Sequence, residues 1–439
     1  MLKLQIIASL AVLTCGQILV WRRRDNVFGY FQAGLFIASV LVPVLGTAVL
    51  DQADPEVVAL YARILAVGAP AYLLGLVYGA GIGHTCRSPS VTFTRVFQAA
   101  PERLAVRARV VAVIAIVALV GAFALLGYVP ALASNRLAAK YGIGPYRAGF
   151  DRGAQLLHLA MGLASALAGV LLAFLAVRRR TVDIVLAGVL LVGLAATLSR
   201  GEALVGPLTF VIAWGIQKRW RPLVLLAIVS MSFFGSIFVN EFLFPTGPAP
   251  VASESFAVRV SHTAPDIVDH LGFLNGYRLT GSQRVGARTL QAGYSLRLSK
   301  GYWDPTDYAL RTRTGLPDVG ELASGGLRLP APIWGYASFG YPGAVAWSWL
   351  AGMFVGWGTA LLRRLLAPVE QGRYPNQSLN LMLAWVLFNG TFAIPAQFYF
   401  PFRSDILLIG LAVALGLTRP ARGFRPVPVA VHAGESRLP

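Results

Sequence analysis

The turn Ser199-Arg200-Gly201-Glu202 holds the residue best placed for chemistry in this sequence. It joins two apolar segments, 182–198 and 203–217, of about 17 and 15 residues. At about 1.5 Å per residue these helices are shorter than the ~30 Å hydrocarbon core of a bilayer, so the turn is drawn towards the membrane. There the Arg200 guanidinium, beside a helix start, can hold a phosphate or pyrophosphate through two hydrogen bonds. A structural role stays open, in which Arg200 reaches lipid headgroups or pairs with Glu202.

A second basic cluster occupies the polar segment 129–153. Four cations occur there with one acid, Asp151; the cations are Arg136, Lys140, Arg147 and Arg152. An anionic ligand would explain this charge, and contact with lipid headgroups is the alternative. We take Arg136 and Arg147 as candidate substrate-binding residues.

The long polar segment 241–336 contains a possible proton acceptor. If the stretch is helical, four ionisable groups share one face: His262, Asp266, Asp269 and His270. Because no cysteine accompanies them and their spacing is loose, we expect a general base here and no metal. His262, His270 or a neighbouring Asp, with Asp266 as the acidic candidate, would take a proton from an acceptor hydroxyl, and ordinary loop charge is the alternative.

The same segment is rich in arginines and aromatic residues. We expect Arg278, Arg284 and Arg288 to bind substrate. The aromatic residues suit either stacking on sugar rings or a belt at the membrane interface; they are Tyr277, Tyr294, Tyr302, Trp303, Tyr308, Trp334 and Tyr336. Trp303 is the aromatic candidate that we assign to substrate. The sequence has no Asp-x-Asp pair and no Walker loop, and we expect no cofactor.

The composition places these residues in a membrane protein. The 439 residues are 56% hydrophobic and only 13% charged, about half the charged fraction of a soluble domain. A net charge of +19 would suggest nucleic acid as the partner of a soluble protein. Here the excess of Lys and Arg in cytoplasmic loops explains most of it, so we expect membrane lipid and no nucleic acid as a partner.

Apolar length predicts an all-α, polytopic membrane protein with about eleven transmembrane helices. They are expected at 2–20, 30–50, 57–82, 110–128, 154–177, 182–198, 203–217, 222–240, 337–361, 379–396 and 405–418. One family of loops and the carboxyl-terminal tail contain 21 Lys and Arg, whereas the short loops of the other family contain six. The richer side is predicted to be cytoplasmic, which places the amino terminus outside and the carboxyl terminus inside.

The chain thus divides into four predicted parts. Residues 1–240 form transmembrane helices one to eight, and 241–336 form a large outer loop that folds on the outer face. Residues 337–418 form helices nine to eleven, and 419–439 form a basic cytoplasmic tail.

Two motifs resemble a known family. The run LAATLSRGEALVGPL, residues 194–208, resembles the Ser-Arg-Gly element of O-antigen polymerases and the related O-antigen ligases. Phe339-Gly340-Tyr341-Pro342-Gly343 resembles the Phe-Gly-x-x-Gly segment where the large outer loop of oligosaccharide repeat-unit polymerases re-enters the membrane. Many helices with a large outer loop before the last few match the family along nearly the whole chain.

The resemblance implies a GT-C-like, metal-independent glycosyltransferase in the bacterial inner (plasma) membrane. It would join polyprenyl-pyrophosphate-linked oligosaccharide units on the outer face, alongside a flippase and a chain-length regulator. Arg200 would hold the pyrophosphate, and arginines of the large outer loop would assist. The family's Arg-x(10)-Gly signature follows no outer arginine here, so a second arginine stays unassigned.

Other readings stay open. In the ligases a loop histidine is the base, and His262 is the nearest candidate, but the glycine pattern expected after it is missing; this favours a polymerase. A flippase or transporter would have charges near the midplane, whereas these gather at the outer ends of the helices. A glycosyltransferase with its carboxylate in the first outer loop would use Asp51, Asp54 or Glu56, in a loop of only six residues.

Overall fold

The computed structural model is described over ten stretches of the chain. They are residues 1–20, 36–41, 44–45, 49–85, 101–177, 180–198, 266–279, 305–316, 327 and 329–370. All regular structure in these stretches is helical. Three of the described helices are long and apolar enough to cross a membrane, over Pro55–Gly83, Ala105–Leu126 and Ala331–Arg364. The described residues are therefore all-α, with three helices that could cross a membrane.

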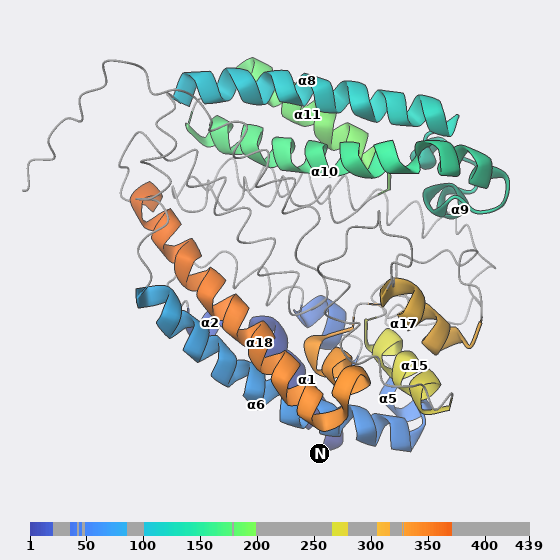
Figure 1. Cartoon of the computed structure of the whole chain (residues 1–439), viewed down its shortest axis with the longest axis vertical. Helices are drawn as coiled ribbons and strands as arrows, with labels where there is room; N and C mark the ends of the chain where they lie inside the picture. The colour runs from blue at the N-terminus through green and yellow to red at the C-terminus, as the bar shows by residue number, and fades with distance from the viewer. Residues whose placement is uncertain are drawn as a thin grey trace, which may run out of the picture.

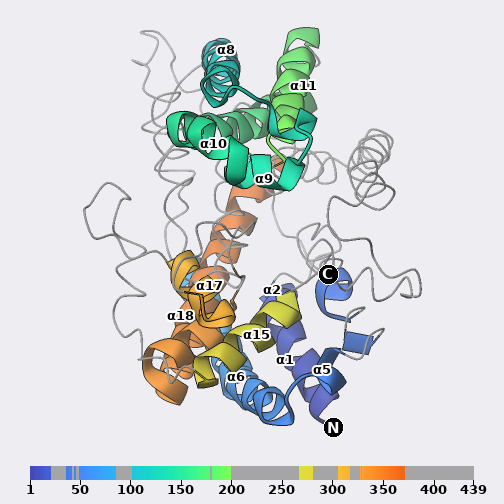
Figure 2. The same cartoon turned by 90° about the vertical axis from the view of Figure 1, so that its right-hand side faces the viewer.

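The described helices form two packed groups (Figures 1 and 2). The first group surrounds the contact between α6 (Pro55–Thr85) and α18 (Ala331–Glu370). Five further elements of this group are α1 (Leu2–Cys15), α2 (Gln17–Val20), η1 (Ile37–Leu41), α15 (Asp266–Leu279) and α17 (Pro305–Thr314). The short helix α5 (Val49–Gln52) precedes α6. The first group thus joins segments from the start, the middle and the later part of the sequence.

Glycines bring α6 and α18 into backbone contact. A Cβ atom on Gly75 would lie 2.0 Å from the Trp349 carbonyl oxygen, and one on Gly79 would lie 1.9 Å from that of Met353. On α18, a Cβ atom on Gly356 would lie 2.0 Å from the Leu76 oxygen. Small residues four apart are typical of membrane helices that pack closely, since they allow backbone approach where lipid removes the hydrophobic drive. The contacts advance together along both helices, which therefore run parallel.

The second group is built on alanine. It contains α8 (Pro101–Leu126), α10 (Arg147–Val177) and α11 (Thr181–Ala196), with α9 (Arg136–Tyr141) and the short helices η2 (Pro130–Leu132) and η3 (Gly144–Tyr146) at one end. Its core includes alanines of α8 at 105, 108, 112, 115 and 122, each no more than 2% exposed. Valines on the outer face of α8, such as Val117, are exposed. This division suits a helix with one face on protein and one on lipid.

A buried ion pair fixes the opposite end of the second group. Arg109 Nε donates to Asp183 Oδ1 over 2.6 Å, and its NH2 group donates to Oδ2 over 2.9 Å. The Asp183 side chain is 1% exposed. This pair joins the first turn of α11 to the early part of α8. Further along both helices, a Cβ atom on Gly193 of α11 would lie 3.0 Å from the Leu119 side chain of α8, so the two helices run parallel.

The ends of the two groups match the predicted alternation of loops. In Figure 1, α9, α15 and α17 lie on the right, and Figure 2, turned so that this side faces the viewer, shows all three in front. Each comes from a segment predicted to be outside. The end of α18, which contains Arg363, lies on the left of Figure 1. Segments predicted to share a side of the membrane therefore share a side of the described structure.

The helices correspond to six predicted spans, with different bounds. The spans 57–82, 110–128 and 337–361 correspond to the three helices able to cross a membrane, and 2–20, 154–177 and 182–198 to α1 with α2, α10 and α11. Helix α8 begins at Pro101, ahead of the predicted 110, and continues through Arg109, whose charge Asp183 balances. Helix α18 begins at Ala331, inside the predicted outer loop. The spans 203–217, 222–240, 379–396 and 405–418, most of 30–50 and the tail 419–439 lie outside the described residues.

Candidate functional site

The end of α11 shapes the approach to Arg200. The helix ends at Ala196, and Thr197 Oγ1 donates a 2.6 Å hydrogen bond to the Leu194 carbonyl. Leu198 then adopts φ 59°, the left-handed region, where a non-glycine residue costs about 1–2 kcal/mol. It is the one non-glycine residue with positive φ in the described stretches. The chain is thus turned sharply two residues before Arg200, which itself lies outside the described residues.

The short first arm of the predicted hairpin is confirmed. Helix α11 has 16 residues, close to the expected 17, and with a rise of about 1.5 Å per residue it is about 24 Å long. It is therefore shorter than a hydrocarbon core of about 30 Å. The second arm, 203–217, lies outside the described residues.

Residues 129–153 fold into a small subdomain at this end of α11, which we call the basic cap. The Tyr128 hydroxyl, just before it, donates to the Ala139 carbonyl over 3.0 Å, and its ring meets that of Tyr146 edge-on at 4.8 Å. Asn135 caps α9, since its Oδ1 accepts a 3.1 Å bond from the Ala138 amide. Gly142 ends α9 with φ 66° beneath the Phe150 ring. These contacts give the basic cap a fixed shape.

Tyr128, the residue before the basic cap, keeps its hydroxyl proton and so remains a hydrogen-bond donor to it. Burial raises the pKa of its hydroxyl, and the neighbouring Tyr146 raises it further. The phenol therefore stays protonated at neutral pH and keeps its bond to α9.

The basic cap presents the four predicted cations together, on α9 and the first turns of α10. Arg147 and Arg152 are exposed, and Arg136 and Lys140 are half-buried. Lys140 lies over the Tyr141 ring at 5.1 Å, and Arg152 Nε donates to the Ala148 carbonyl of its own helix over 3.1 Å. None of the four forms an ion pair with a carboxylate in the described part of the chain. Their charge is available to a ligand.

The predicted proton acceptors of the long outer segment divide along α15. Asp266 is the first residue of this helix, and His262 lies outside the described residues. Asp269 is 7% exposed and forms an ion pair with Arg313 of α17. His270 is 5% exposed, and its Nδ1 lies 2.9 Å from the Tyr61 hydroxyl of α6. Asp269 and His270 therefore hold α15 against its neighbours, and His262 and Asp266 remain the candidates for the base.

Arg278, predicted to bind substrate, lies at the end of α15 against two carboxylates. Its NH1 is 3.0 Å from Asp54 Oδ2, and its NH2 is 2.5 Å from Glu56 Oε2. All three side chains are well exposed, at 39%, 41% and 75%. This pairing was not predicted from the sequence, although acids at the start of a predicted span and an arginine in another outer segment are a usable signal for it. In this arrangement the charge of Arg278 is balanced within the protein.

Several of the aromatic residues expected either to stack on sugar rings or to form an interface belt pack against one another. Phe273 of α15 contacts the rings of Tyr277, Tyr308 and Trp334 with centroids 6.0, 6.2 and 6.2 Å away. Trp334 is fully buried, so stacking on a sugar is a wrong expectation for this residue. Burial raises the pKa of Tyr308 to about 12. These rings join α15, α17 and α18 into one aromatic core, while Trp303, Arg284 and Arg288 lie outside the described residues.

The Phe-Gly-x-x-Gly segment breaks α18. Phe339 has φ −141° and ψ 17°, and Gly340 has φ 69° and ψ −152°, a backbone conformation open to glycine. A Cβ atom on Gly335 would lie 2.2 Å from the Gly343 oxygen, so the chain folds closely on itself across the break. Two short turns of helix, which contain Trp334, thus precede the long part of α18.

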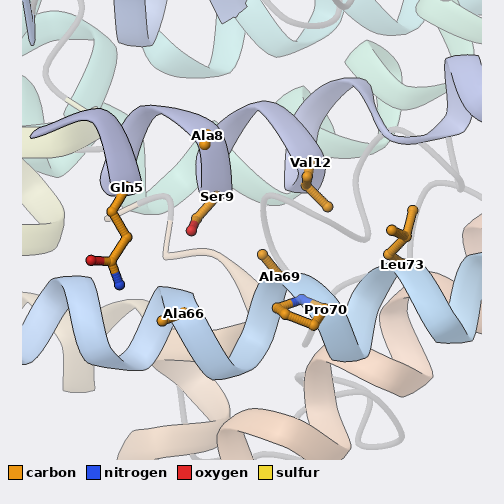
Figure 3. Close-up of a pocket in the computed structure, with 8 residues that line it drawn as sticks. All are labelled: Gln5, Ala8, Ser9, Val12, Ala66, Ala69, Pro70 and Leu73. Carbon is orange, nitrogen blue, oxygen red and sulfur yellow. The ribbon is translucent and has the colours of Figure 1, made fainter. Parts of the chain in front are cut away.

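An apolar groove of about 370 Å³ separates α1 from α6. Figure 3 shows the residues of α1 facing those of α6; the lining residues are Gln5, Ala8, Ser9, Val12, Ala66, Ala69, Pro70 and Leu73. Pro70 has no N–H, which leaves the Ala66 carbonyl without its helical donor. The groove contains no charged side chain and suits hydrocarbon better than a diphosphate.

Within the described stretches, no group of three His, Cys, Asp or Glu residues is placed to hold a metal ion. Comparison with known proteins adds no assignment: no protein-family model, no curated protein and no solved structure matches this chain.

Proposed function

We propose that the protein is a membrane-embedded glycosyltransferase that polymerises polyprenyl-pyrophosphate-linked oligosaccharide repeat units into a surface polysaccharide. The observation that supports this most is the position of the basic cap. Its four cations, without carboxylate partners among the described residues, lie at the end of α11 that leads directly to Arg200. Such a concentration of positive charge at the end of a short membrane helix suits a lipid-linked diphosphate.

The proposed reaction exchanges one bond at the anomeric carbon of the donor sugar. The bond from this carbon to the pyrophosphate oxygen breaks, and a bond to the acceptor hydroxyl oxygen forms. The hydroxyl proton goes to a base, for which His262 and Asp266 are the candidates. Polyprenyl pyrophosphate leaves with the electron pair, and Arg200 stabilises its negative charge by two hydrogen bonds.

The wider assignment follows from the same proposal. The chain would have about eleven transmembrane helices and a large outer loop in a GT-C-like arrangement, in the bacterial inner membrane with the amino terminus outside. The agreement between predicted sides and the two ends of the described helices supports this plan. A flippase would supply the lipid-linked units, and a chain-length regulator would act on the product.

The test is chain growth by the purified protein. Incubation with lipid-linked repeat units, without added metal, is expected to give a ladder of products on a gel. Arg200→Ala should abolish the ladder, and Arg200→Lys should also fail, because an ammonium group cannot make the two-pronged contact. Arg180→Ala, at the other end of α11, is the matched control and should keep the ladder.

The product distinguishes the alternatives. Single transfer to a different lipid acceptor, without a ladder, would indicate a ligase. Movement of the lipid-linked unit across the membrane without any new glycosidic bond would indicate a flippase. Either result, or an unchanged ladder with Arg200→Ala, would contradict the proposal.

A further inference from the structure

The basic cap combines three features that the proposed reaction at Arg200 does not require. It has a fixed backbone, it presents four cations against one acid, Asp151, without an ion pair between any of them and a described carboxylate, and it exposes an apolar residue. Leu132 of η2 is 84% exposed. The cap follows Leu126, the last residue of an apolar helix long enough to cross a membrane. It therefore lies where the hydrocarbon of a bilayer gives way to headgroups.

The shape of the cap is set independently of its cations. Tyr128 holds α9 through the Ala139 carbonyl, and Ser134 Oγ lies 3.1 Å from the Tyr146 hydroxyl. A Cβ atom on Gly149 would lie 2.0 Å from the Leu126 oxygen, so α10 starts in backbone contact with the end of α8. The Asn135 amide also donates to the Tyr146 hydroxyl over 3.4 Å, so the start of α9, where Arg136 lies, is connected to the residue before Arg147. Of the four cations, only Arg152 bonds to a described cap residue, the Ala148 carbonyl.

Arg136 and Arg147 are the least committed of the four cations. Lys140 lies over Tyr141, and Arg152 is bonded to the Ala148 carbonyl. The side chains of Arg136 and Arg147 make no hydrogen bond or ion pair with a described residue. Keeping like charges together costs free energy, which a bound anion would offset. Guanidinium groups match the geometry of phosphate oxygens.

We infer that the basic cap is a binding site for the phosphate headgroup of a membrane lipid, separate from Arg200. Arg136 and Arg147 contact the phosphate oxygens, Lys140 and Arg152 add to the positive potential, and Leu132 lies in the acyl region. The shared chemistry is a lipid phosphate, either the diphosphate of a polyprenyl carrier or the phosphodiester of an anionic phospholipid. This inference rests on the same basic cap that supports the proposed function, but it does not require polymerisation, since a ligase or a flippase would have the same site.

Hydrogen exchange of the full-length protein tests the inference. The protein is placed in nanodiscs of phosphatidylcholine, and a polyprenyl diphosphate or phosphatidylglycerol is titrated in. We expect slower exchange of amides in residues 129–153. The variant with Arg136→Gln and Arg147→Gln should need about 25-fold more lipid, at about fivefold for each cation removed near a membrane surface.

The control variant also loses two positive charges, but at positions far from the basic cap. The double variant Arg180→Gln with Arg363→Gln removes one cation at the start of α11 and one in the last part of α18, both on the side predicted to face away from the basic cap. It should leave the lipid titration at the basic cap unchanged. Protection by the diphosphate alone assigns the site to the lipid carrier, and protection by both lipids assigns it to phosphate headgroups in general. Both outcomes support a lipid phosphate site.

Three outcomes would overturn it. They are no protection by either lipid, an equal shift in the control variant, and protection by inorganic pyrophosphate without either lipid. The result is independent of the ladder assay, so failure of one proposal is distinguishable from failure of the other.

Discussion

The two helical groups treat charge in opposite ways. In the first group, the described ion pairs join different parts of the chain, as Asp269 joins Arg313 and Arg278 joins Asp54 and Glu56. In the second group, one buried pair, Arg109 with Asp183, lies at one end, and the cations of the basic cap remain without a carboxylate at the other. Charge in the first group thus joins distant segments, whereas the four cations of the basic cap form no ion pair within the described part of the chain.

The two groups also differ in how closely their helices pack. Helices α6 and α18 approach through several glycines, with backbone atoms in contact. Helices α8, α10 and α11 meet mainly through alanine, and glycine brings backbones together at the start of α10, where Gly149 meets Leu126. A backbone contact tolerates no added side chain, and an alanine contact tolerates little. The first group should therefore be the more sensitive to mutation, and the following changes test this difference from the largest expected effect to the smallest.

Gly79→Val should be the most damaging. Its Cβ would lie 1.9 Å from the Met353 oxygen, so α6 and α18 would have to separate, and we expect a loss of at least about 3 kcal/mol of stability. Gly188→Val in α11 is the control, because a Cβ there meets nothing within 4 Å. Thermal unfolding in detergent measures both. Equal midpoints for the two variants would show that the glycine contact does not hold the first group together.

Asp183→Ala should destabilise the second group by about 3 kcal/mol, because it leaves Arg109 without its partner in an apolar region. The double variant Arg109→Met with Asp183→Ala should recover most of the loss, since it removes both charges. Chemical denaturation of the wild-type protein, Asp183→Ala, Arg109→Met and the double variant gives the coupling. Additive losses in the double variant would mean that the two side chains are not coupled.

Tyr61→Phe should cost about 1–3 kcal/mol, since it removes the hydroxyl that meets buried His270. The change also tests whether this contact holds α15 on α6, through faster amide exchange over residues 266–279. Tyr78→Phe, at an exposed position of the same helix, is the control and should have little effect. Unchanged exchange of α15 in Tyr61→Phe would count against its docking through His270.

Arg278→Ala should have the smallest effect on stability, about 1 kcal/mol or less, because its ion pairs are exposed and screened by salt. The loss should shrink further at high ionic strength. Chain growth should continue in this variant, since Asp54 and Glu56 already balance the charge of Arg278. A complete loss of the ladder with unchanged stability would restore the substrate-binding role predicted from the sequence.

Apolar length predicted the helices well and their partners poorly. The segment 57–82 is apolar enough to be recognised alone, but nothing local indicates that Gly75 and Gly79 meet residues of α18 that lie 274 positions later. The contact between Tyr61 and His270 joins positions 209 residues apart. Such contacts depend on how the helices pack against one another. No short stretch of the sequence contains this information.

The sequence predicted that residues 129–153 carry an excess of positive charge, but not how this segment folds. Positive charge in a segment predicted to be outside indicated the basic cap, because such charge opposes the usual distribution. Its internal structure was missed, as Tyr128, Asn135 and Gly142 are common residues whose roles depend on the fold. Trp334 was expected to stack on a sugar ring or to lie in an interface belt. Its type alone did not distinguish these positions from the core, because an aromatic residue suits all of them. The roles of all the candidate site residues remain predictions: Arg200, His262, Asp266, Arg136, Arg147, Arg278, Arg284, Arg288 and Trp303.

The central claim is that both groups present their chemical residues to one side of the membrane. Its direct test is labelling of single cysteines in intact cells with a membrane-impermeant maleimide, in a background with Cys15→Ala and Cys86→Ala. Ser134→Cys in the basic cap and Leu279→Cys at the end of α15 are exposed and should both react. Arg180→Cys should react only after permeabilisation. Labelling of Ser134→Cys and Leu279→Cys from opposite sides would contradict the account.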